Sequence, residues 1–132
     1  MTTLDAILDR TAFLRRVLMV DAATCVATGL LMTLFATPLA TLLELPAALL
    51  AYAGAALFPI AVFMGWLAVR DDVSRAGTWL VILGNAGWVA GSVLVLLLFS
   101  PTAVGYAFVI AQAVVVAFLA ELEVYGLRRI AS

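Results

Sequence analysis

Four long apolar stretches occupy almost the whole chain and decide what it can fold into. They cover about residues 17–35, 46–69, 76–99 and 102–124 of the 132 residues. A helix that crosses the hydrocarbon core of a bilayer needs about 20 consecutive apolar residues. Helices are favoured there because they satisfy every backbone polar group internally. We therefore expect an all-α fold, a four-transmembrane-helix bundle that runs up-down-up-down as one integral membrane domain, residues 1–132.

The composition agrees with a membrane location. Hydrophobic residues make up 67% of the chain and charged residues 11%, and the mean hydropathy is +1.23. A soluble domain carries about a quarter charged residues. This chain has too few polar side chains to cover a water-exposed surface, so the lipid bilayer is its expected surroundings.

The arginines predict the orientation. All seven basic residues are Arg, and they lie before the first span, between the second and third, and after the fourth: Arg10, Arg15, Arg16, Arg70, Arg75, Arg128 and Arg129. The other two connections contain none. Basic residues accumulate on the cytoplasmic side of membrane proteins, so we expect both termini in the cytoplasm. The lack of Lys and the abundance of Ala, Leu and Val favour a bacterial inner membrane.

The segments outside the spans give further expectations. Residues 2–16 show helical spacing of apolar side chains and predict a short N-terminal amphipathic helix that lies in the membrane interface. Residues 39–45 are expected to form a connector, and residues 125–132 a short tail. Pro59 falls inside the second span, where it removes a backbone donor and predicts a kink.

Glycine recurs every seven residues in the third span. Each glycine precedes a small polar residue, giving the pairs Gly77-Thr78, Gly84-Asn85 and Gly91-Ser92. A seven-residue period keeps one seam facing a neighbouring helix, and glycines on such a seam allow close approach. We expect a close-packed helix interface here. The alternative is that Asn85, Trp88 and Ser92 line a pocket.

The first span carries a polar stripe at helical spacing, formed by Asp21, Thr24, Cys25 and Thr28. An acidic residue at the centre of a membrane helix costs roughly 2.5–3.5 kcal/mol on insertion scales. We expect Asp21 to reach the interface or to pair with an Arg. The alternative is a buried role, as a proton or cation site or as a fixed hydrogen-bond acceptor.

The fourth span contains Gln112 near its middle and two acidic residues near its end. Helical geometry places Glu123 on the same face as Gln112, whereas Glu121 points almost the opposite way. Asn85 and Gln112 should reach a similar depth from adjacent helices, so we expect them to be close.

Several function classes lack their usual residues. The chain has no His and a single Cys, which removes the commonest metal ligand, the usual membrane haem ligand and the favoured general base. No phosphate-binding loop or nucleophile elbow is present. We expect no catalytic, cofactor-binding or metal site, no enzyme activity, and no nucleic-acid partner, because basic residues are not in excess.

Three functions remain. The first is a non-enzymatic membrane component that acts through helix–helix contacts, as an accessory or assembly subunit bound to other membrane chains or as a homo-oligomer. The second is a small proton- or cation-coupled transporter or channel, in which Asp21 would be the coupling carboxylate and Trp88 a stacking wall for an organic cation. The chain resembles the small multidrug resistance exporters in size and layout, and this resemblance assigns no residue roles. The third is binding of a hydrophobic small molecule such as a lipid, quinone or pigment. The candidate intramembrane site comprises Asp21, Thr24, Thr28, Asn85, Trp88, Ser92 and Gln112.

Overall fold

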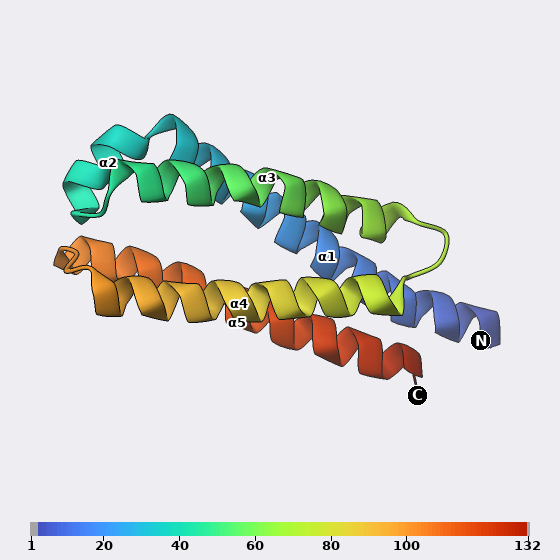
Figure 1. The fold of residues 1–132 in the computed structure, drawn as a ribbon. Coiled ribbons are helices and arrows are strands. Elements are labelled where there is room, and N and C mark those ends of the chain that lie inside the picture. Colours follow the sequence, from blue (N-terminus) through green and yellow to red (C-terminus); the bar gives the residue numbers. More distant parts are fainter. Residues whose placement is uncertain (1–2, 132) are drawn as a thin grey trace.

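The computed structural model describes residues 3–131, and side chains for residues 11–130, as an all-helical chain. The described elements are α1 (Thr3–Leu34), α2 (Ala36–Leu43), α3 (Ala47–Val69), α4 (Arg75–Leu98) and α5 (Ala103–Ala131). All except α2 are long and apolar enough to cross a membrane. The chain is therefore a multi-pass membrane protein. The two ends of the chain and the α3–α4 loop lie at one end of the molecule, and α2 lies at the other (Figure 1).

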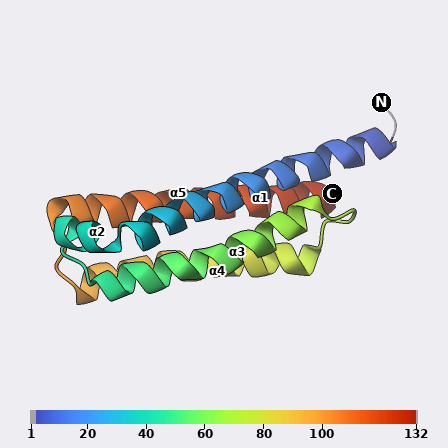
Figure 2. The ribbon, with the colours of Figure 1, turned by 90° about the horizontal axis from the view of Figure 1, so that it is seen from above.

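The four long helices form an incomplete ring. Helix α1 packs along α3 and also on α5, and α5 packs on α4, whereas α3 and α4 hardly touch. Figure 2 shows α1 beside α5, with α3 and α4 on the opposite side of the molecule. Consecutive helices in a small bundle usually pack against each other because their loop is short. Here the α3–α4 loop joins two helices that leave an open seam between them.

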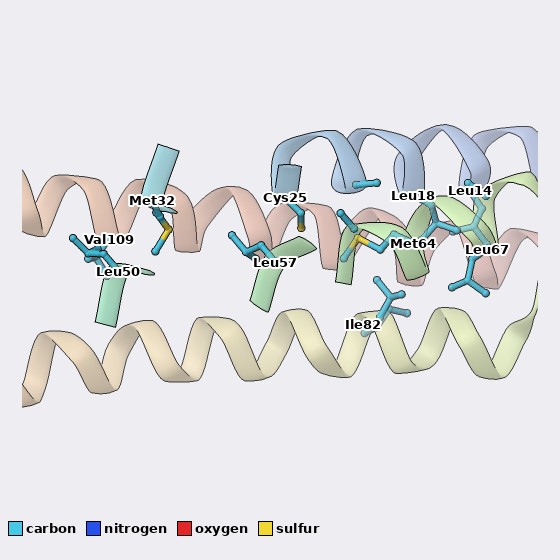
Figure 3. Packing of buried hydrophobic residues seen from close by; sticks show 14 of the residues in the cluster. Leu14, Leu18, Cys25, Met32, Leu50, Leu57, Met64, Leu67, Ile82 and Val109 are labelled. Carbon is cyan, nitrogen blue, oxygen red and sulfur yellow. The ribbon is translucent and has the colours of Figure 1, made fainter. Parts of the chain in front are cut away.

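The buried core follows the contact between α1 and α3. In Figure 3 the labelled core residues come mostly from these two helices, and Ile82 is the one labelled residue from α4. The closest approach is made by two glycines. A Cβ atom added to Gly54 would lie 2.7 Å from the Cβ of Met32, and one added to Gly29 would lie 3.0 Å from the carbonyl oxygen of Gly54. Glycine at these positions therefore lets the two backbones meet.

The expected separate amphipathic helix at the N-terminus is not observed. Residues from Thr3 onward are helical, but α1 continues without interruption to Leu34. The physical reason is local, because the sequence has neither Gly nor Pro before Gly29 to end a helix. The segment thus prolongs the first span instead of lying flat beside it. Residues 1–2 and the side chains of residues 3–10, which carry most of the predicted amphipathic face, lie outside the part of the chain that the structure describes.

The expected connector before the second long helix is itself mostly helical. Helix α2 ends at Glu44, which adopts a left-handed conformation with φ 56°. Pro38 lies in its first turn, where a missing backbone donor costs no hydrogen bond. The α4–α5 turn docks on this short helix, because the backbone N–H of Thr102 donates to Leu43 O at 3.0 Å and its hydroxyl donates to Leu42 O at 2.9 Å.

The expected C-terminal tail is also helical, since α5 extends to Ala131. Tertiary contacts explain the extra turns. Gly126 packs against Leu14 of α1, with 3.2 Å between the Leu14 side chain and the place a Cβ would occupy. The rings of Phe13 and Tyr125 meet edge to face at 5.5 Å, and the Arg129 guanidinium lies 5.5 Å from the Phe13 ring. The last turns of α5 are therefore held on the first described turns of α1.

Candidate functional site

Three polar side chains from three helices meet in the interior. Asn85 of α4 donates from Nδ2 to Asp21 Oδ2 of α1 at 2.8 Å and to Glu123 Oε1 of α5 at 2.9 Å. Asp21 is 1% exposed, Glu123 0% and Asn85 6%. We call Asp21, Asn85 and Glu123 the buried triad. Its hydrogen bonds connect helix α4 to both α1 and α5 through one amide group.

The two carboxyl groups of the buried triad are neighbours, because Asp21 Oδ2 and Glu123 Oε1 both accept from the one Asn85 nitrogen. Glu123 Oε2 is fully buried and receives no hydrogen bond from any side chain or backbone group that the structure describes. Two ionised carboxylates this close repel strongly in a site of low dielectric constant, and neighbouring carboxyl groups commonly share one proton.

The expectation that Asp21 reaches the interface or pairs with an Arg was wrong. Arg15 donates to Ala68 O and to Asp71 O, both at 2.8 Å, and so fixes the level of the α3–α4 loop on α1. Asp21 lies six residues farther on, about 9 Å deeper along the helix. The donors to its carboxylate are Asn85 and, weakly at 3.9 Å, the Cys25 thiol. Asp21 is therefore a buried hydrogen-bond acceptor.

A second polar cluster lies deeper, between α4 and α5. Trp88 Nε1 donates to Gln112 Oε1 at 2.6 Å, and Gln112 Nε2 donates to Ser92 Oγ at 2.9 Å and to Val109 O at 2.8 Å. The Ser92 hydroxyl donates to Trp88 O at 2.8 Å. Each polar atom of the Gln112 amide thus has a partner, as its depth in the bilayer requires.

A cavity of about 600 Å³ fills the open seam between α3 and α4. Apolar side chains of α3 and α4 form its sides, among them Ile60, Phe63 and Leu80, and Pro59 is also part of the wall. Polar side chains line it from α1, α4 and α5: Thr24, Cys25, Thr28, Asn85, Trp88 and Gln112. We call this space the α3/α4 cleft. Asp21 and Glu123 do not border it, and they lie behind Asn85 and Cys25.

A second cavity of about 380 Å³ continues the cleft on the other side of Trp88. Trp88 and Gln112 border both cavities, and Ser92 borders the second. Pockets for small organic molecules commonly measure about 300–1,000 Å³ and are mostly apolar with a few polar groups. The α3/α4 cleft has this size and this character.

The glycine repeat of the third span does not form the expected packed interface. A Cβ atom added to Gly84 or to Gly91 would meet no atom within 4 Å, whereas one added to Gly77 would lie 2.6 Å from the Leu67 side chain. Gly84 borders the first cavity, and Gly91 the second. The physical reason is the missing contact between α3 and α4, so these glycines keep one wall of the cleft free of side chains.

The remaining residues of the predicted site lie along the α3/α4 cleft. Asn85 and Gln112, which were expected to be close, border the same cavity, and their described hydrogen bonds go to other partners. The Thr24 hydroxyl donates to the backbone carbonyl of Asp21 at 2.8 Å. Thr28 borders the cleft.

Glu123 was missing from the candidate site, although a signal for it existed. It follows Gln112 by eleven residues, which is about three helical turns, so the two share a face of α5. The predicted fourth span ends at about residue 124, only one residue beyond Glu123. The extension of α5 to Ala131 places it well inside the helix instead.

Comparisons with known proteins give no relative. No model of a protein family matches the chain, and neither a curated protein nor a solved structure is significantly similar to it. Among the described residues, no group of three or more His, Cys, Asp or Glu side chains could hold a metal ion.

Proposed function

We propose that this protein binds a lipophilic small molecule in the α3/α4 cleft, as a non-catalytic component of a bacterial inner membrane. The observation that carries the proposal is the cleft itself, a cavity of about 600 Å³ with apolar sides and polar groups along its floor. Its rim includes Ile60 and Leu80, which are exposed on the surface of the bundle. A molecule dissolved in the bilayer could therefore reach the cleft from the side.

A small molecule suits the cleft better than a helix of another chain. Close packing of two helices is made by side chains that interdigitate over a surface, and protein interiors leave few voids larger than a water molecule. A helix laid on the rim would leave much of the recess around Asn85 and Trp88 unfilled. The structure thus offers less support for an accessory subunit that acts through helix contacts, which is the competing role.

The proposed orientation places both termini and the α3–α4 loop in the cytoplasm, with up-down-up-down spans. The support is that all seven Arg fall on these segments. Single cysteines in a Cys25→Ala background test it with a membrane-impermeant maleimide. When the reagent reaches only the periplasmic side, we expect it to label Ser100→Cys. We expect Asp72→Cys to be labelled only after the membrane has been permeabilised. Labelling of both from the periplasm would contradict the topology.

Filling the cleft tests the binding function. A side chain at Gly84 would project into the cleft without meeting an atom within 4 Å, so Gly84→Leu should occupy the space and leave the fold intact. Gly65 is the matched control, because it also meets no atom within 4 Å but does not border either cavity.

The readout is native mass spectrometry of the protein extracted from its own membranes into nanodiscs. We expect a lipophilic small molecule bound to the wild type and to Gly65→Leu but absent from Gly84→Leu. Equal binding by all three proteins would count against the cleft as the site. Loss of a co-purifying membrane protein from Gly84→Leu alone would favour the accessory-subunit role.

A second candidate function, proton-coupled transport, is supported by the buried triad. Two neighbouring carboxyl groups lie directly behind Asn85, which borders the cleft, and one of their oxygens has no described donor. Buried carboxyl groups inside a membrane bundle are often proton relays. In this function Asp21 is the coupling carboxylate. Purified protein in vesicles with a pH-sensitive dye tests it: potential-driven proton flux should be lost in Asp21→Asn, and equal flux in the variant and the wild type would argue against transport.

A further inference from the structure

The side-chain amide of Asn85 faces two different surroundings. Its nitrogen donates to both Asp21 and Glu123. This assignment of nitrogen and oxygen follows from the network, because the opposite orientation would place the amide oxygen against carboxylate oxygens. The nitrogen end is therefore committed to the buried triad.

The oxygen end of the same amide is free on the side of the cleft. Asn85 Oδ1 accepts no hydrogen bond from the residues that the structure describes. Among these residues, the side-chain N or O atom that is fully buried without a hydrogen-bond partner is Glu123 Oε2. Asn85 Oδ1 is therefore not fully buried and is accessible. Because Asn85 borders the α3/α4 cleft, its Oδ1 is an acceptor available to a bound molecule.

The neighbouring polar groups strengthen this acceptor character. The Thr24 hydroxyl donates its hydrogen to the Asp21 backbone carbonyl, so its oxygen can act only as an acceptor towards the cleft. The Gln112 amide is already engaged with Trp88, Ser92 and Val109. Thr28 borders the cleft, and its hydroxyl has no bond to a described group, so it can either donate or accept.

The carboxyl groups behind Asn85 also make its Oδ1 a stronger hydrogen-bond acceptor. An amide that donates to carboxylates is polarised, and hydrogen bonds in a chain reinforce one another, so its oxygen becomes a better acceptor. A ligand carbonyl oxygen placed beside Asn85 Oδ1 could form no hydrogen bond with it, because both atoms are acceptors. A ligand hydroxyl or ammonium group would complete the chain of hydrogen bonds.

We infer that the α3/α4 cleft takes lipophilic molecules whose polar end donates a hydrogen bond, such as an alcohol or an amine, with Asn85 Oδ1 as the acceptor. This inference rests on the proposed binding function and adds the class of ligand to it. The apolar body of the ligand would lie along the glycine-lined wall of α4, past Gly84 and towards Gly87 and Gly91, which border the second cavity.

Fluorescence of Trp88 provides the test, because this residue borders both cavities. With Trp66→Phe and Trp79→Phe, Trp88 is the one remaining tryptophan of the chain. The probe is 6-bromododecan-1-ol in nanodiscs, since bromine quenches tryptophan on contact and the middle of the chain can lie beside Trp88 when the hydroxyl is at Asn85, one helical turn away. Unlabelled dodecan-1-ol, dodecylamine and dodecan-2-one then compete at equal mole fraction in the lipid.

We expect the alcohol and the amine to displace the probe about tenfold more effectively than the ketone, the factor that one lost hydrogen bond is worth. Equal displacement by all three would overturn the inference and leave the binding function standing. A preference for the amine alone would assign a cationic head group, and a preference for the alcohol alone a neutral one, and both support a donor. Quenching that is the same in Gly84→Leu as in the parent would overturn the binding function as well.

Variants of the polar residues complete the test. Thr28→Val keeps the shape of the side chain and removes a hydroxyl that bonds to no described group, so it should fold and bind the alcohol several times more weakly. Thr33→Val is the control, because the Thr33 hydroxyl donates to Gly29 O of its own helix and does not border the cleft. Equal loss in both variants would show that the Thr28 effect is not one of ligand contact and would contradict this part of the inference.

Discussion

The Asn85 side-chain nitrogen lies 2.8 Å from Asp21 Oδ2, although the two residues are 64 positions apart in the sequence. Helices α1 and α4 have no backbone contact of their own. This bond and the one to Glu123 therefore fix the level of α4 against the two helices that carry the carboxyl groups. A polar link inside the bilayer replaces the side-chain packing that α4 lacks on the side of α3.

Replacing Asn85 tests that link. Asn85→Leu removes two hydrogen bonds and leaves two buried carboxyl groups without their shared donor, so we expect the free energy of unfolding to fall by about 2 kcal/mol. Thermal unfolding in detergent measures the change. Ala86→Leu is the control, because Ala86 is exposed on the same helix. An unchanged melting temperature for Asn85→Leu would remove the structural role assigned to the amide.

Glu123 should tolerate replacement by its amide. Glu123→Gln keeps the oxygen that accepts from Asn85 and replaces the second oxygen by an NH2 group, which can donate to the neighbouring Asp21 carboxylate. We expect the melting temperature to stay equal to that of the wild type or to rise. Glu121→Gln, at an exposed position two residues earlier, should have no effect. A loss of stability in Glu123→Gln as large as that in Asn85→Leu would mean that the carboxyl group itself is required.

Gln112 should be needed for the position of Trp88. Gln112→Leu leaves the Trp88 indole N–H without its acceptor, and an unpaired buried donor costs about 1–3 kcal/mol. We expect a lower melting temperature and, in the protein where Trp88 is the one tryptophan, a shift of its emission. Ala111→Leu, on an exposed part of the same helix, should cause neither change. Identical emission from the Gln112→Leu protein and its parent would argue against the hydrogen bond.

The glycine contact between α1 and α3 should be intolerant of a methyl group. Gly54→Ala puts a Cβ 2.7 Å from the Met32 Cβ, and overpacking of this kind typically costs about 1–3 kcal/mol. Gly65→Ala meets no atom within 4 Å, so it should be neutral or should stabilise α3 by up to about 1 kcal/mol through helix propensity. Thermal unfolding of the two variants side by side tests this, and equal stability would disprove the close contact.

The sequence was sufficient for the number of spanning helices, because apolar length is a property of each segment alone. It also placed Asn85 and Gln112 away from water, since both lie near the middle of a span, but it missed the burial of Asp21 and Glu123. It was not sufficient for their partners. Asn85 bonds to Asp21 and Glu123 because α1 and α5 approach it at that level, and no spacing within α4 encodes the approach.

The glycines also show what the sequence could not predict, namely which of them form a close contact between helices. The regular repeat of Gly77, Gly84 and Gly91 indicated a packed seam, but Gly84 borders the α3/α4 cleft and Gly91 borders the second cavity. The close contact uses Gly29 and Gly54, which belong to no repeat within either helix. Glycine permits a close approach without requiring one, so the neighbouring helix decides which glycines are used.

The position of α1 has a consequence for how the chain is made. Its packing partners are α3 and α5, and its buried carboxyl group accepts from Asn85, which also donates to Glu123. During synthesis α1 reaches the membrane before α3, α4 and α5, so Asp21 must remain in the insertion machinery or in lipid without Asn85 and Glu123 until these three helices have been translated. Ribosome-bound chains that stop before Asn85 should therefore keep α1 within reach of crosslinks to the translocon, and release should follow the arrival of α4 and α5.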